Sequence, residues 1–266
     1  MTELVPGAPP DRLLPTVPVL GTPVVATTFE RALETLLAAP REGWRLRAHF
    51  ATAHMLVEAN RDPALHATLA SADLVFPDGM PLVWIARRRQ SDEPVGRVCG
   101  PDILPALVAR STAEGRRHYF YGGAPGVAEE LARRLAERHP GLTVAGIESP
   151  PFRPLTADEE RTVAERINAS GADYVWVGLG SPKQEHWVAR FRPDLEASVL
   201  LAVGAAFDFH AGSKRRAPLW MQRTGTEWLF RLVSEPRRLA ARYTKTNLQF
   251  AWLALRESLH RRRGRS

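Results

Sequence analysis

The chain has 266 residues, 44% of them hydrophobic, and a formal net charge of +7. A chain of this length can bury a sizeable core, either as one large α/β domain or as a domain with an appendage. Its single cysteine, Cys99, excludes an internal disulfide and fits a reducing compartment. The chain opens on no secretion signal and has no run of about 18 apolar residues, so we expect a cytoplasmic protein without a membrane-spanning helix.

The positive charge is concentrated in the C-terminal tail. From Lys214 onward the tail holds 14 lysine and arginine residues and three acidic residues, a net of +11, whereas the preceding body holds 22 basic and 26 acidic residues, a net of −4. Such a tail predicts a polyanion or an anionic membrane surface as partner. A solvated helix face is the alternative interpretation.

Strand-like and helix-like segments alternate along most of the chain. After a loose arm at 1–16, we expect strands at 17–25 (one strand or a hairpin), 46–51, 72–76, 118–121, 143–147, 174–177 and 199–203, and helices at 28–39, 53–60, 63–71, 81–89, from 102 to 113, from 126 to 138, and at 156–169. The alternation between about 45 and 205 predicts an α/β fold: a Rossmann-like, mostly parallel sheet with right-handed crossovers and helices on both faces.

The segment 172–218 organises this pattern, because it reads as a strand, a helix and a second strand, with a loop after each strand. Ser181 is expected to cap the helix, with Pro182 in its first turn and Gln184 completing a capping box. Gly178 and Gly180 precede the cap, so backbone can approach a ligand there. In open α/β sheets such loops lie at the carboxyl edge, and a helix N-terminus favours anions.

After residue 218 the pattern changes to helices only. We expect one helix at 220–233 and a second from 234 to about 260, on which Arg238, Arg242 and Lys245 share a face beside an apolar and aromatic one. This pattern indicates an interfacial helix or, equally, a helix packed on its own domain. We therefore divide the chain into an arm (1–16), a catalytic α/β domain (17–213) and a basic helical appendage (214–266).

Two acidic residues follow predicted strands at the ligand edge of the sheet. Asp78 ends a strand in a Pro-Asp-Gly corner and is a candidate general base, although a turn or helix cap is the commoner role of such an Asp. Asp208 lies between two phenylalanines in what we expect to be a loop, where its charge requires a partner such as an arginine or a ligand donor. The motifs of serine hydrolases and zinc enzymes are absent, as is a D-x-D motif, so we expect no metal site.

Short motifs spread from about residue 17 to 250 together resemble the WecG/TagA/CpsF family of bacterial glycosyltransferases (glycosyltransferase family 26). They are ADLVFPDG at 72–79, RVCGPD at 97–102, GGAPG at 122–126, VGLGSPKQE at 177–185, VGAAFDFHAG at 203–212, RAP at 216–218, EWLFR at 227–231, EP at 235–236 and RY at 242–243. Their order and spacing are those of the family.

The resemblance implies an inverting, metal-independent enzyme without a cofactor. Such an enzyme moves a sugar, N-acetylmannosamine or a related hexose, from a UDP-sugar to a polyprenyl-diphosphate-linked saccharide in cell-wall or exopolysaccharide synthesis, at the inner face of the plasma membrane. Asp78 matches the proposed base, and Arg97 and Gln184 match other catalytic-site residues. Expected substrate-binding residues are Thr52, Gly79, Asp102, Gly122, Gly123, Gly178, Gly180, Lys183, Glu185, Asp208, Arg231, Arg238 and Arg242, the last three on an appendage that reaches the membrane.

One segment departs from the family pattern. Phe50 and Thr52 stand where the family's T-x-N motif has threonine and asparagine, so the donor sugar stays open. A non-catalytic membrane scaffold and a nucleic-acid-binding protein using the basic tail are the alternatives. We expect no nucleic-acid partner, because the tail offers only scattered aromatics for stacking. A homo-oligomer stays open.

Overall fold

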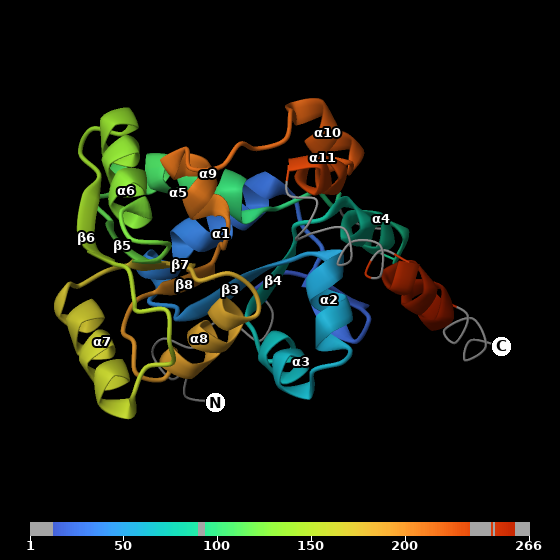
Figure 1. The fold of residues 1–266 in the computed structure, drawn as a ribbon, viewed down its shortest axis with the longest axis horizontal. Helices are drawn as coiled ribbons and strands as arrows, with labels where there is room; N and C mark the ends of the chain where they lie inside the picture. The colour runs from blue at the N-terminus through green and yellow to red at the C-terminus, as the bar shows by residue number, and fades with distance from the viewer. Residues whose placement is uncertain (1–12, 90–93, 235–245, 247, 259–266) are drawn as a thin grey trace.

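The structure is a computed structural model that describes residues 13–89, 94–234, 246 and 248–258. Within them, a two-stranded hairpin adjoins a six-stranded sheet that is covered by helices (Figure 1). The hairpin strands are β1 (Thr16–Val19) and β2 (Thr22–Val25), and the sheet strands are β3 (Leu46–Ala51), β4 (Leu74–Pro77), β5 (Arg117–Gly122), β6 (Thr143–Glu148), β7 (Tyr174–Gly178) and β8 (Val199–Ala202).

The helices follow the strands in the alternation that the sequence predicts. They are α1 (Phe29–Glu42), α2 (Ala53–Ala59), α3 (Pro63–Ala70), α4 (Met80–Arg89), α5 (Gly100–Thr112), α6 (Val127–Arg138), α7 (Ala157–Ala169), α8 (Lys183–Phe191), α9 (Ala206–Ala211), α10 (Leu219–Thr224) and α11 (Glu227–Ser234), and residues 248–258 are also helical. Local capping explains several starts. Thr28 caps α1, and Thr156 and Glu159 form the predicted capping box of α7.

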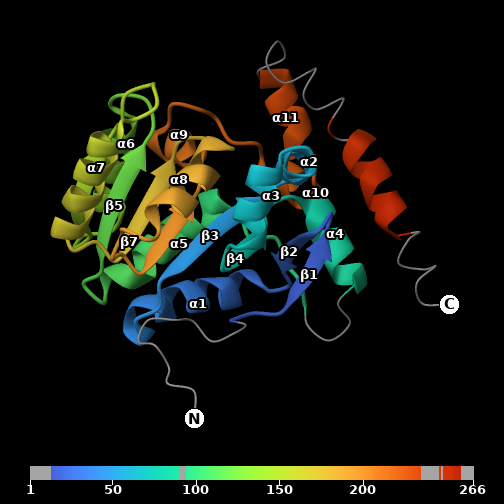
Figure 2. The same ribbon diagram turned by 90° about the horizontal axis from the view of Figure 1, so that it is seen from below.

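The six-stranded sheet has the order β4-β3-β8-β7-β5-β6, and all its neighbouring strands are parallel (Figure 2). The prediction of a parallel sheet is therefore confirmed. The central strands β7 and β8 are buried on both faces, as their apolar sequences require. Because every strand runs in the same direction, the loops that follow all six strands meet at one edge of the sheet.

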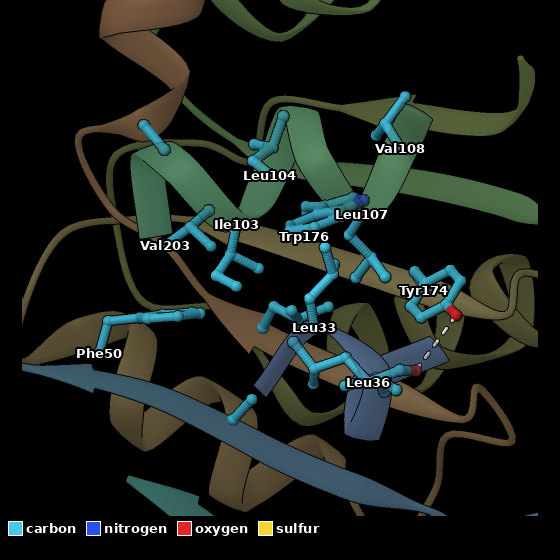
Figure 3. Close-up of a cluster of buried hydrophobic side chains, with 14 of the residues drawn as sticks. Leu33, Leu36, Phe50, Ile103, Leu104, Leu107, Val108, Tyr174, Trp176 and Val203 are labelled. Carbon is cyan, nitrogen blue, oxygen red and sulfur yellow. Dashed lines mark hydrogen bonds between the residues drawn. The ribbon is translucent and has the colours of Figure 1, made fainter. Parts of the chain in front are cut away.

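Helices pack on both faces, as the alternation predicts. On one face α1, α5, α6 and α9 cover a core in which Trp176 packs with Leu33 and Leu107 (Figure 3). The hydroxyl of Tyr174 donates a hydrogen bond of 3.2 Å to the carbonyl of Leu36, so its polar end is satisfied inside this core. On the other face α7 and α8 bury Trp187 against β5, β7 and β8. The helices packed on both faces of the sheet thus fix the positions of the strands and of the loops that follow them.

The C-terminal segment differs from the prediction. The single helix expected at 220–233 is two helices, α10 and α11, because the chain turns at Gly225, where φ is +74°. A left-handed residue of this kind ends a helix, and glycine adopts it without strain. The next helix is expected to begin at 234, but Ser234 is the last residue of α11, and 235–245 lie outside the described residues. Residues 248–258 are helical as expected, and Phe250 packs against the hairpin and α4. Of the helices that the structure describes, none is long and apolar enough to span a bilayer.

Candidate functional site

A cavity of about 1070 Å³ lies along the carboxyl edge of the sheet, and the loops after all six strands contribute to its wall. Ten of the residues expected at the site line it: Thr52, Asp78, Gly79, Arg97, Gly123, Gly178, Gly180, Lys183, Gln184 and Asp208. The corners after β4, β5, β7 and β8 therefore converge on one rim, as the sequence predicts. This is the position at which open α/β sheets bind ligands.

At one end of the cavity Arg97 joins two carboxylates. Its Nη2 donates to Asp78 Oδ1 at 3.0 Å and to Glu227 Oε2 at 2.8 Å, and its Nε donates to the backbone carbonyl of Asp78. All three side chains are about four-fifths buried. Arg97 thus ties the strand end that carries Asp78 to the first residue of α11, across 130 positions of sequence.

The backbone on either side holds this group in place. Asp78 N–H donates to the carbonyl of Ala51 at 2.9 Å, which continues the β3–β4 ladder past the end of the strand. Val98 N–H donates to Pro77 at 3.0 Å, so the segment that carries Arg97 runs beside the same strand. Burial by itself lowers the pKa of Arg97, but the negative charges of Asp78 and Glu227 raise it by more. The pKa of Arg97 therefore lies above its ordinary value, and the guanidinium stays charged.

The start of α8 differs from the prediction. No side chain caps this helix, and Gln184 is buried rather than closing a capping box with Ser181. Its Oε1 accepts from Gly180 N–H at 3.1 Å, and its Nε2 donates to Ala202 O at 3.2 Å and to Glu185 Oε1 at 2.9 Å. The amide therefore joins the loop after β7 to the end of β8.

Glu185 does not line the cavity, although the sequence places it among the substrate-binding residues. Its side chain is fully buried behind Gln184, and burial raises the pKa of Glu185 from its ordinary value of 4.5 to about 7, despite the hydrogen bond from Gln184. Its Oε2 has no hydrogen-bond partner. This carboxyl is therefore a source of pH-dependent stability.

We expect Glu185→Gln to stabilise the protein at alkaline but not at acidic pH. Since the folded-state pKa lies above the unfolded one, stability falls as pH rises from about 4.5 to about 7 and then stays low. The shift corresponds to roughly 3 kcal/mol at pH 8, which the neutral glutamine recovers, and to almost nothing at pH 4.5. Urea unfolding at both pH values measures this, with the exposed Glu165→Gln as control. An equal effect at both pH values would contradict it.

Asp208 has a partner but not the predicted surroundings. It lies in α9 rather than in a loop, and its carboxylate accepts from Lys214 Nζ at 2.8 Å and from Ser213 Oγ at 3.1 Å. The expected need for a partner is thus met by a lysine that follows in the chain. Both Asp208 and Lys214 line the cavity.

Two of the predicted glycines serve packing between neighbouring segments. A Cβ on Gly122 would lie 2.7 Å from the backbone of Gly178, and a Cβ on Gly178 would lie 2.7 Å from the ring of Phe207. Gly122 itself does not line the cavity. Gly180 has a φ of +77° and open space beside it. Of these three glycines it therefore best fits the prediction that exposed backbone approaches a ligand.

Asp102 and three arginines of the C-terminal segment are the remaining predicted residues. Asp102 accepts from Cys99 Sγ at 2.9 Å and from Arg216 Nη1, and although burial opposes it, these hydrogen bonds lower the pKa of Asp102. It is not among the residues that line the cavity. Arg231 belongs to α11, and Arg238 and Arg242 fall outside the described residues.

The segment that departs from the family pattern lies on the cavity wall. Phe50 is buried and stacks on Phe76 with 5.5 Å between ring centroids, and Thr52 uses its hydroxyl to cap α2 by accepting from Met55 N–H. Both line the cavity. Where the resemblance leads one to expect a polar pair, this chain has an apolar ring and a capping hydroxyl.

Glu227 and Phe152 are two of the cavity residues to which the sequence assigned no role in the site. Glu227 went unnoticed because its partner Arg97 is distant in sequence, although it opens the EWLFR motif. Phe152 went unnoticed because it lies between prolines outside any periodic pattern, yet it is 98% exposed and lines the cavity. A lone aromatic in a proline-rich loop was the available signal.

Comparison with known proteins agrees with this architecture. The model of the glycosyl transferase WecG/TagA/CpsF family matches residues 17–264. The N-acetylglucosaminyldiphosphoundecaprenol N-acetyl-beta-D-mannosaminyltransferase of Bacillus spizizenii is 32% identical over 215 residues, which are 80% of this chain and 79% of that protein. Since the family model covers most of the chain and this relative is 32% identical, the chain belongs to the WecG/TagA/CpsF family of glycosyltransferases.

Proposed function

We propose that the protein transfers a sugar, N-acetylmannosamine or a related hexose, from a UDP-sugar to a polyprenyl-diphosphate-linked saccharide, with inversion and without a metal ion. The acceptor class is that of the relative's name. The observation that carries the proposal is the Asp78–Arg97 pair at one end of a cavity that is lined by the loops of all six strands. This geometry combines a carboxylate with a fixed cation at a ligand-binding edge.

In this mechanism Asp78 takes the proton of the acceptor hydroxyl as its oxygen forms a bond to the anomeric carbon. The bond from that carbon to the diphosphate oxygen breaks on the opposite side, so the configuration inverts and UDP leaves with the electron pair. The negative charge of the departing UDP is stabilised by backbone N–H groups near Gly180, by the N-termini of α6 and α8, and by arginine side chains. Arginine suits a diphosphate because its planar fork makes paired hydrogen bonds.

Association with an anionic membrane is part of the proposal. Exposed tryptophans occur on α4 (Trp84), on α10 (Trp220), on α11 (Trp228) and at Trp252 within 248–258. A Cβ on Gly225 would lie 3.5 Å from the Trp84 ring, so the turn between α10 and α11 packs against α4. Amphipathic tryptophans are enriched where proteins meet lipid head groups, and the basic tail adds electrostatic attraction.

The test is a transfer assay on vesicles. The purified chain, with EDTA present, is mixed with a panel of UDP-sugars and a short-chain polyprenyl-diphosphate-linked N-acetylglucosamine in anionic vesicles. We expect mass spectrometry to find one added sugar from one donor, NMR of the product to show inversion, and the protein to sediment with anionic but not neutral vesicles. Absence of transfer and of UDP binding would favour the non-catalytic scaffold, and unchanged sedimentation on neutral vesicles would contradict the membrane role.

A further inference from the structure

The loop between β6 and α7 presents an aromatic ring at the cavity. Pro150, Pro151 and Pro154 restrict this loop, and Phe152 within it is 98% exposed. Arg153 N–H donates to Pro151 O at 2.8 Å, and the Arg153 guanidinium donates to both oxygens of Glu159 at 2.7 and 2.6 Å. One hydrogen bond thus forms within the loop, the ion pair ties the loop to α7, and Phe152 faces solvent rather than the core.

One cation already lies over this ring. Lys183 Nζ is 4.4 Å from the centroid of Phe152, and both side chains line the cavity. Lys183 is the first residue of α8, directly after the loop of Gly178 and Gly180. An exposed ring beside an ammonium group is suited to stacking against a planar, polar ligand ring.

The two ends of the cavity differ in chemistry. The end near β4 is charged and holds Asp78, Arg97 and Glu227, whereas the end near β5 and β6 adds Tyr121 and Trp187 to Phe152 as aromatic lining. The strands β4 and β6 form opposite edges of the sheet, and Figure 1 places β6 and α7 at the other end of the molecule from α4 and α11. Phe152 nevertheless lies close to the loop after β7, because Lys183 at the start of α8 has its Nζ 4.4 Å from the ring centroid.

This polarity orders a nucleotide-sugar along the cavity. With the anomeric carbon at Asp78, the diphosphate comes next and reaches the glycine loops after β7 and β8. The ribose and base then extend toward β5 and β6, where the lining is aromatic. Every nucleobase has a planar π-face and can stack on an aromatic side chain, whichever hydrogen-bonding groups it carries on its edge.

We propose that Phe152 is the stacking platform for the nucleobase of the donor. The inference rests on the proposed UDP-sugar donor and adds a binding residue to it. Phe152 contacts the base and takes no part in proton or sugar transfer, so its removal weakens donor binding while the diphosphate contacts persist.

Calorimetric titration of the full chain with UDP and with inorganic diphosphate tests this. We expect Phe152→Ala to weaken UDP binding by about 5- to 150-fold, the range of a lost base–aromatic stack, and to leave diphosphate binding within about two-fold. Phe152→Trp should retain UDP binding, because it keeps a planar ring. Ile147→Ala is the matched control, because it removes an exposed apolar side chain from β6, the strand that precedes this loop, and Ile147 does not line the cavity.

The outcomes separate the inference from the function beneath it. Unchanged UDP binding in Phe152→Ala, or equal losses for UDP and for diphosphate, overturns the stacking role and leaves the transferase intact. No UDP binding by the unsubstituted chain removes the proposed donor and the platform together.

Discussion

Asp78→Asn is expected to lower kcat by about 10²–10⁴-fold, the range for loss of a general base. Asparagine has nearly the same shape and still accepts a hydrogen bond, so the contact with Arg97 Nη2, 3.0 Å in the unsubstituted protein, is retained in weaker form. It cannot take a proton from the acceptor hydroxyl at neutral pH. The loss should therefore fall on kcat, while UDP binding changes little.

The measurement is steady-state transfer of the donor sugar to the lipid acceptor, with thermal unfolding to verify the fold. Asp158→Asn is the matched control, because Asp158 is exposed on α7 and is ion-paired only locally with Arg161. We expect full activity from it. Near-normal turnover in Asp78→Asn would remove Asp78 from the role of base, even if the protein is confirmed as a transferase.

Arg97→Lys is expected to lower kcat/KM by about 10²–10³-fold, comparable to the loss of one preorganised donor to a developing anion. Arg97 reaches three acceptors: the Asp78 backbone carbonyl, Asp78 Oδ1 and Glu227 Oε2. A lysine ammonium keeps the charge but not the planar fork that makes these bonds together. Asp78 then loses its fixed orientation, and Glu227 is left without its partner in a site that is mostly buried.

The same variant should lose stability, because the bridge from the strand end to α11 is broken. Urea unfolding is expected to show a loss of about 1–3 kcal/mol, the cost of a partly buried charge without its hydrogen bonds. Arg161→Lys, an exposed arginine with one local partner, is the control that should change neither activity nor stability. An Arg97→Lys enzyme with normal kcat/KM would show that charge alone suffices at this position.

Much of the fold follows from local sequence features. The apolar runs at 174–177 and 199–203 are too short for helices and have the length of strands. Because they do not alternate between apolar and polar residues, both of their faces must be buried, as they are in a parallel sheet. Thr156 and Glu159 lie three positions apart, so their capping box forms within one turn and depends on nothing distant. Predictions of this kind succeeded because the interactions that decide them span a few residues.

The start of α8 shows where such reasoning fails. Ser181 and Gln184 have the spacing of a capping box, but the Gln184 amide bonds Gly180 N–H and, 18 positions away, the Ala202 carbonyl. A buried amide must satisfy its donors and its acceptor at once, and the end of β8 lies within its reach only after the sheet has formed. The hydrogen bond to Ala202, which exists only in the folded sheet, therefore replaces the local capping interaction with Ser181.

By itself, then, the sequence determined the strand and helix order, the parallel sheet and the edge at which Asp78, Gly180 and Asp208 converge, because parallel strands bring their carboxyl ends together. Only the tertiary structure decided that Arg97 joins Asp78 to Glu227, that Glu185 is buried away from the cavity and that Phe152 is exposed within it. These outcomes depend on contacts between segments distant in sequence and on the solvent left around each side chain. Neither is encoded in residue spacing.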